Sequence, residues 1–350
     1  MKTLLYSIHH QVRKALLAMA IALPMVSCHT VWDDDDDCPV ETEYRVKFVH
    51  DYNMLFTDAF ATQVRSITLY AFDEDGKLVL QQSEQGEALS RDDYTMKLDL
   101  APGNYRLVAW AGLAEGNAYT VPVLTENISD KEDLTCRINR YPTTLHDEPI
   151  DSVGYLHPLW HGIVETQTLT RAATETQVIT LPLMKNTSTI RVILQQLAQG
   201  QLDASQFDFT ITDENGMMTH ENRLVEGDGV LTYMPYHQAQ GSTVVEGEAS
   251  EEQLNVVVAE LSVGRLMADA DTRLTISNRQ TGETILSIPL IDYLELCRTV
   301  ANYDMPLQEY LDREDTYTMT FFLDSNQSWI NTQVIINDWI VRFNDITPEL

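Results

Sequence analysis

The chain alternates apolar and polar residues in short runs, and this period-two pattern is the feature that most constrains its fold. The first runs are separated by turn-forming pairs such as Asp75-Gly76 and Pro102-Gly103. Alternation buries one face of a strand and exposes the other, whereas an amphipathic helix needs apolar residues three and four positions apart. The pattern predicts half-buried antiparallel strands at Tyr44–Val49, Ile67–Phe72, Tyr94–Leu98 and Tyr105–Trp110.

The rest of the chain continues this pattern, with one predicted helix at residues 291–300. Residues 51–62 lack alternation and fit either a short helix or a packed crossover loop. Residues 117–160 contain four prolines, which predict long loops. The further predicted strands lie at residues 176–183, near Leu231, and at 254–261, 273–277, 284–290, 317–323, 332–336 and 339–343.

A stretch of the first half recurs in the second. Residues Ser66–Gly76 align with Gln206–Gly216, and each copy ends in Asp-Glu-x-Gly. Each copy follows a strand with a similar three-residue kernel, Tyr44-Arg-Val46 or Ile190-Arg-Val192. Such a repeat predicts two related domains, although convergence on a common hairpin is the alternative. Without alternating strands and helices, the expectation is an all-β chain of two tandem sandwiches, residues 39–184 and 185–350.

The first 27 residues have the pattern of a cleaved export signal. Lys2, Arg13 and Lys14 precede the apolar run Ala15–Val26, which is too short to cross a bilayer of about 30 Å. Ser27 directly before Cys28 resembles the lipobox of bacterial lipoproteins, in which the cysteine is acylated and begins the mature chain. An ordinary secretory signal with an incidental cysteine is the alternative.

Five consecutive aspartates follow the proposed lipidation site. Their like charges and the absence of apolar periodicity predict a solvated spacer over residues 28–38 rather than a preorganised metal site. In lipoproteins of the Bacteroides group, such acidic residues resemble a signal for transfer to the outer face of the outer membrane. A plain linker is the alternative. The residues concerned are Asp33, Asp34, Asp35, Asp36 and Asp37.

Charge and cysteine content exclude several classes of partner and site. The formal net charge is −30, which disfavours nucleic acid and anionic lipid headgroups, so membrane contact is expected through the lipid on Cys28. The remaining cysteines are Cys38, Cys136 and Cys297, and no pair has the CxxC spacing. Cys38 with Cys136 is the possible disulfide, because both fall in the first predicted domain. Three free thiols are the alternative.

The sequence gives no positive indication of catalysis or of a cofactor other than the covalent lipid. The Asp-Glu-x-Gly turns lack the remaining ligands of a calcium loop, and Pro158 interrupts the helical spacing of His157 and His161. Nucleophile elbows and phosphate-binding loops are absent. Aromatic residues near predicted loops are candidates for stacking on sugars, although Trp110 also fits core packing. These candidates are Trp110, Tyr119, Tyr155 and Trp160.

Several stretches together resemble the FimB-like fimbrillin-anchor lipoproteins of the Bacteroides group. They are residues 44–54, 58–61, 102–112, 265–268, 308–313, 317–323 and 336–341.

This resemblance implies two transthyretin-like β-sandwiches and an acylated cysteine. It also implies a place in the outer membrane, at the base of a fimbrium, where the subunit holds the shaft and limits its length. The implied partners are fimbrial shaft subunits, joined by β-strand addition. A surface glycan-binding or adhesin lipoprotein is the alternative function.

Overall fold

The chain folds mainly into β-strands, as the alternation predicts. The strands predicted at residues 44–49, 67–72 and 105–110 are confirmed, and so is the all-β class. The structure is a computed structural model, and it describes residues 42–171, 176–196, 202–245, 252–301, 303–337 and 339–342.

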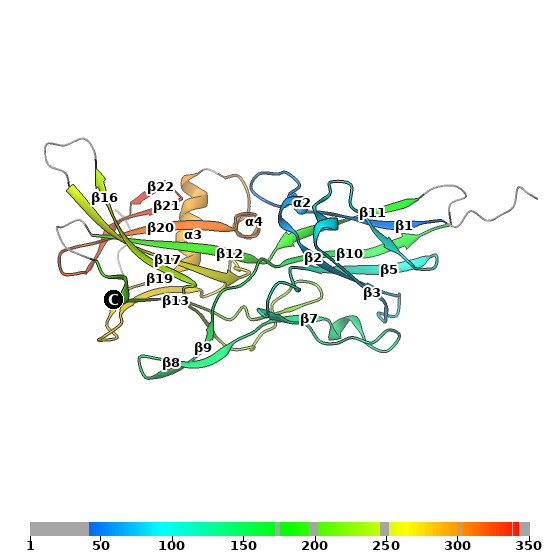
Figure 1. Cartoon of the computed structure of the whole chain (residues 1–350), viewed down its shortest axis with the longest axis horizontal. Helices are drawn as coiled ribbons and strands as arrows, with labels where there is room; N and C mark the ends of the chain where they lie inside the picture. Colours follow the sequence, from blue (N-terminus) through cyan, green and yellow to red (C-terminus); the bar gives the residue numbers. More distant parts are fainter. Residues whose placement is uncertain are drawn as a thin grey trace, which may run out of the picture. The chain divides into compact units, whose positions relative to one another are not determined.

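The first half of the chain forms one sheet that turns over on itself through strand β11, in the order β3-β2-β5-β10-β11-β1-β4 (Figure 1). The first part of β11 pairs in parallel with β1, and its last three residues pair antiparallel with β10. β11 therefore connects two layers, whose core includes Phe48, Leu69 and Leu181. The strands are β1 (Tyr44–Val49), β2 (Ser66–Phe72), β3 (Leu78–Gln85), β4 (Met96–Leu98), β5 (Gly103–Ala111), β10 (Trp160–Leu169) and β11 (Gln177–Lys185).

A small sheet in the order β14-β7-β6 covers the outer face of β2 and β5. Trp110, Leu134 and Met218 belong to the apolar cluster between these layers. Both faces of β5 are therefore covered, which explains why Leu107–Ala111 is buried at every position although alternation predicts one wet face. The covering strands are β6 (Tyr119–Thr120), β7 (Thr135–Ile138) and β14 (Met217–Thr219).

The second half forms two sheets around a common core. Their orders are β16-β17-β12-β20-β21-β22 and β19-β18-β13-β15-β9-β8. Val192 and Phe321 of one sheet share an apolar cluster with Phe209 and Ile276 of the other. The strands are β12 (Thr187–Gln196), β13 (Phe207–Asp213), β15 (Leu231–Tyr233), β16 (His237–Val245), β17 (Glu252–Gly264), β18 (Arg273–Asn278), β19 (Thr284–Pro289), β20 (Thr316–Leu323), β21 (Trp329–Ile336) and β22 (Trp339–Arg342).

Short helices complete the fold. Helix α3 confirms the predicted helix, and its residues Leu290, Leu294 and Cys297 are buried at helical spacing in the second-half core. Residues 51–62 are mainly a loop that leads into the single-turn helix α2, and α4 lies in a segment without a helix prediction. The helices are α2 (Phe60–Gln63), α3 (Leu290–Val300) and α4 (Leu307–Arg313), with 3-10 turns at Glu87–Ser90, Lys131–Asp133 and Ala204–Gln206.

The two halves exchange strands. The hairpin of β8 (Tyr141–Leu145) and β9 (Glu148–Val153) precedes β10, yet β9 pairs in parallel with β15 of the second half. In return, β14 pairs with β7 of the first half. Figure 1 shows the β8–β9 hairpin on the side of β13 rather than of β2 and β5. The long loops predicted over residues 117–160 are wrong at these strands. β9 pairs with a strand that is remote in sequence, and Pro142 stands in the edge strand β8, where a missing N–H is tolerated.

The internal repeat is visible in the strand pairing. β1 and β12 each lie between one parallel and one antiparallel neighbour. β2 and β13 each lie between two antiparallel neighbours. The copies differ at the Asp-Glu-x-Gly turn, which closes the β2–β3 hairpin in the first half but leads out of the sheet to β14 in the second. The division into domains at residue 184 stays a prediction.

Candidate functional site

The residues predicted to attach the protein to a membrane lie outside the described residues. This holds for Cys28, for Asp33–Asp37 and for Cys38, so lipidation, tether and disulfide stay predictions. Cys136 is buried on β7 and is a free thiol among the described cysteines, and burial raises its pKa to about 12. None of the helices in the described ranges has the length and apolarity to cross a membrane.

The histidines with metal-ligand spacing lie in different surroundings. His161 is buried on β10, with Nε2 2.9 Å from the carbonyl oxygen of His220 and its ring edge-on to Trp110. Burial lowers the pKa of His161 to about 4, so this imidazole is neutral at neutral pH. His157 instead packs edge-on to Tyr155. No group of three or more metal-ligating side chains occurs within the part of the chain that the structure covers.

Most of the aromatic residues considered for sugar stacking belong to the interior. Trp110 and Trp160 are 0% and 1% exposed, so core packing is confirmed for Trp110 and the sugar-stacking hypothesis is wrong for both. The Tyr119 hydroxyl donates to the carbonyl oxygen of His157. Tyr155 alone among these candidates has a largely exposed ring, because it follows β9 at the surface.

Three stretches that carry the family resemblance meet at one place, which we call the junction: residues 50–58, Arg265–Ala268 and α4. Arg265 Nε and Nη2 donate to the two carboxylate oxygens of Asp312 at 2.8 and 2.9 Å. The two side chains are only 14% and 6% exposed. Arg265 Nη1 donates to the carbonyl oxygen of Asn222 at 2.6 Å. This bidentate pair holds α4 against the end of β17.

Helix α4 also contacts the first half. The Arg313 guanidinium lies 4.0 Å from the ring centroid of Tyr52 and 4.7 Å from that of Phe56, within the range of cation–π attraction. On the opposite side, Gln308 Nε2 donates to the carbonyl oxygen of Leu266, and its Oε1 accepts from the N–H of Ala268. The helix therefore connects the loop at residues 50–58 to the segment after β17.

Side chains brace the loop at residues 50–58. Asn53 Nδ2 donates to the carbonyl oxygens of His50 and Thr57, and the Asp58 carboxylate accepts from the N–H groups of His50 and Phe60. The Phe56 backbone is held at φ 51°, a region that bulky residues seldom adopt. The loop thus projects an ordered apolar tip into solvent.

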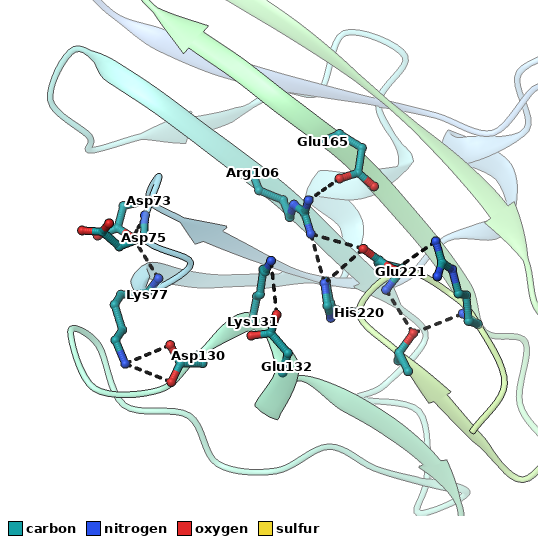
Figure 2. Close-up of polar contacts among 12 residues, drawn as sticks. Asp73, Asp75, Lys77, Arg106, Asp130, Lys131, Glu132, Glu165, His220 and Glu221 are labelled. Carbon is teal, nitrogen blue, oxygen red and sulfur yellow. Dashed lines mark hydrogen bonds and ion pairs between the residues drawn. The ribbon is translucent and has the colours of Figure 1, made fainter. Parts of the chain in front are cut away.

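The segment at residues 219–224, which we call the clasp, fastens the second half to the first. Asn222 and Asn186 exchange two amide hydrogen bonds of 2.6 and 3.1 Å, and both side chains are buried. Figure 2 shows Arg106 on β5 between Glu165 and the pair His220 and Glu221 of the clasp. Elsewhere in the same view, Lys77 binds Asp130 and ties the β2–β3 turn to the segment before β7.

A cavity of about 350 Å³ lies between the junction and the clasp. Its lining is mainly apolar and includes the end of the short β10–β11 pairing, where the two strands separate. Two carboxylates and one guanidinium supply its charge. The lining residues are Asp51, Tyr52, His161, Gly162, Ile163, Pro182, Leu183, Met184, Glu221, Asn222 and Arg265.

Comparison with known proteins places this architecture in a family. The profile of the fimbrillin-A associated anchor proteins Mfa1 and Mfa2 matches residues 34–345. The chain belongs to this family. The family's description is of fimbrial anchor proteins and names no enzymatic activity. The predicted fimbrial resemblance is confirmed, and the chain is a fimbrium-associated protein of structural type. A search of curated proteins finds no match.

Solved structures share the fold of this chain. A candidate adhesin of Bacteroides thetaiotaomicron is 35% identical, with 86% of this chain and 97% of that chain covered and a TM-score of 0.74. A candidate polysaccharide-binding protein of the same organism is 32% identical, covers 87% of this chain and 99% of its own, and has a TM-score of 0.72. The fimbrial anchor protein Mfa2 of Porphyromonas gingivalis shares the fold, at 14% identity, 86% and 99% coverage and a TM-score of 0.61.

Sequence reasoning found the stretches of the junction but not their meeting, and it missed the clasp. His220, Glu221 and Asn222 follow the short strand β14, whose three residues carry no readable period. The one available signal was Arg265 directly after a long apolar strand, since a charge at such a place needs a partner.

Proposed function

We propose that this chain is a lipid-anchored subunit of the outer membrane that attaches a fimbrium shaft to the cell surface and limits its length. The observation that carries the proposal is the match to an anchor-protein family over residues 34–345, which begins inside the acidic spacer that follows the predicted lipidation site Cys28. Each buried acyl methylene contributes roughly 0.8 kcal/mol, so several chains on Cys28 would hold the protein in the membrane essentially permanently.

The interlocked halves suit a subunit that links a membrane to a fibre. A pull on one half reaches the other through the exchanged strands, the junction and the clasp rather than through a flexible linker. The same contacts would keep the chain intact while the shaft is loaded.

We propose that shaft subunits join by β-strand addition at an open sheet edge. β16 is the longest edge strand in the described ranges, and it pairs only with β17. Its residues His237–Val245 include no proline and no aspartate, glutamate, lysine or arginine, the residues with which natural edges resist pairing. Its main-chain groups are therefore suited to accept a strand.

Replacing Cys28 with alanine tests the attachment. We expect this protein and the fimbriae to move from the cell envelope into the medium, because the acyl chains are the proposed membrane contact. Cys38→Ala is the matched control and should leave both on the cells. Fractionation followed by immunoblotting measures the distribution. Retention of protein and fimbriae on Cys28→Ala cells would contradict the proposal.

The adhesin alternative gives a different result with the wild-type protein. Under the anchor proposal, detergent extracts yield shaft subunits together with this chain. Binding on a glycan array without any fimbrial partner would instead favour a surface glycan-binding lipoprotein.

A further inference from the structure

We infer that the cavity between the junction and the clasp is a docking socket for an extended segment of a partner protein, one with a bulky apolar side chain beside a lysine or arginine. The inference rests on the proposed function in one respect, namely that the partner is a fimbrial subunit. Four features of the described residues support it.

The first feature is the apolar floor of the cavity. Ile163 of β10 and Pro182 of β11 lie where the two strands separate, and Leu183 and Met184 complete this wall. The volume of about 350 Å³ lies near the lower limit for small-molecule sites, roughly 300 to 1,000 Å³. A cavity of this size suits one or two projecting side chains.

The second feature is the excess of negative charge at the cavity. Among the lining residues the cation is Arg265, and Asp312 already pairs with it in bidentate fashion. Asp51 is exposed, and its carboxylate has no ion-pair partner among the described residues. Glu221 is paired with Arg106 and with Arg223, so Asp51 is the lining carboxylate that supplies the uncompensated charge. An entering cation next to Asp51 therefore gains attraction, and an entering anion is repelled.

The third feature is a pair of exposed apolar side chains at the tip of the loop at residues 50–58, on the same loop as the cavity residue Tyr52. Tyr52 lines the cavity, and Arg313 stacks on both Tyr52 and Phe56. Beyond them, Leu55 and Phe56 are 84% and 62% exposed. Contiguous exposed apolar side chains of this size mark interaction sites more often than isolated ones do.

The fourth feature is the ordering of that tip before any partner arrives. Asn53 and Asp58 fix the loop through main-chain hydrogen bonds, and Phe56 keeps its left-handed backbone. Backbone conformations of this kind persist where the surroundings hold them, and they concentrate at ligand-binding positions. A preformed tip loses little conformational freedom on binding.

Peptide titration tests the socket. The probe is a dye-labelled peptide, Gly-Ser-Phe-Lys-Phe-Lys-Ser-Gly, which is added to the purified full mature chain in detergent. Fluorescence anisotropy measures its binding, and empty detergent micelles serve as the blank. We expect saturable binding. The same peptide with glutamate in place of lysine should bind at least about tenfold more weakly, because Asp51 would repel it.

A pair of charge variants locates the site. Asp51→Lys should weaken binding of the lysine peptide about tenfold, whereas Asp99→Lys, the same exposed charge change between β4 and β5, should leave it unchanged. Circular dichroism checks that both variants fold. The inference fails if the lysine peptide does not bind up to roughly 1 mM, or if the two variants behave alike.

If the chain self-associates and Asp51→Lys abolishes that self-association, the inference is also overturned, since a second copy of the chain would then occupy the socket. Because the peptide assay uses purified protein and the Cys28→Ala experiment uses cells, failure of the socket and failure of the anchor proposal are distinguishable.

Discussion

Replacing Asp312 with alanine should lower the free energy of unfolding by about 3 to 5 kcal/mol, measured by urea denaturation. The loss is large because the variant leaves the positive charge of Arg265 without its carboxylate partner. Arg265 is 14% exposed and gives two donors to the Asp312 carboxylate, so the variant leaves a guanidinium shielded from water with only the carbonyl oxygen of Asn222 to accept from it. Asp312 also accepts from Gln308 Nε2 at 3.0 Å, and that bond is lost as well.

The control is an arginine–carboxylate pair at the surface, in which two guanidinium nitrogens meet a single carboxylate oxygen. Arg191 on β12 binds Glu260 on β17, but its side chain is 51% exposed. Solvent screening limits such pairs to about 0 to 1 kcal/mol, so Arg191→Ala should be nearly neutral. Equal losses in the two variants would mean that the junction pair contributes no more than a surface contact.

Replacing Gly112 with alanine should prevent stable folding or cost more than about 4 kcal/mol. Gly112 follows β5 at φ 92°, and a Cβ there would lie 2.0 Å from the carbonyl oxygen of Pro158. That oxygen belongs to the backbone just before β10, so it moves only if the strand moves. At this contact, the segment of residues 113–159 leaves the first-half sheet after β5 and returns to it at β10.

Gly86→Ala separates the clash from the backbone conformation. Gly86 has φ 88°, nearly the same as Gly112, and a Cβ there would meet nothing within 4 Å. Its ψ of −152° lies in a region that residues other than glycine almost never adopt, so the backbone penalty alone is about 1 to 3 kcal/mol. Thermal unfolding of the two variants compares them directly, and similar melting temperatures would contradict the close crossing of Gly112 and Pro158.

The sequence predicted the long strands with a clear apolar period far better than the short or proline-containing ones. β1 and helix α3 have clear periods, and their burial follows those periods. β14 has only three residues, and β8 and β9 each contain a proline, so their local patterns do not indicate strands. β9 and β14 moreover pair with strands that are remote in sequence. Residues 107–111 of β5 are apolar at every position, which fits burial on both faces, so the prediction of one wet face was wrong there.

The candidate site likewise contains residues that the sequence pointed to and contacts that only the fold creates. The stretches around Arg265 and Asp312 carried the family resemblance, but only the fold brings them to 2.8 Å. The aromatic candidates Trp110 and Trp160 are buried, because large aromatic rings are stabilised by packing in a core. Cys28 and Asp33–Asp37 depend on chemistry and charge rather than on packing, and they stay predictions.

Immunogold labelling of this protein on whole fimbriated cells tests the central claim most directly. If the protein is an anchor, we expect gold particles at the membrane end of each fimbrium, where the lipid on Cys28 and the shaft would meet. Gold along the shafts, at their free ends, or on the cell surface without any relation to fimbriae would contradict the account.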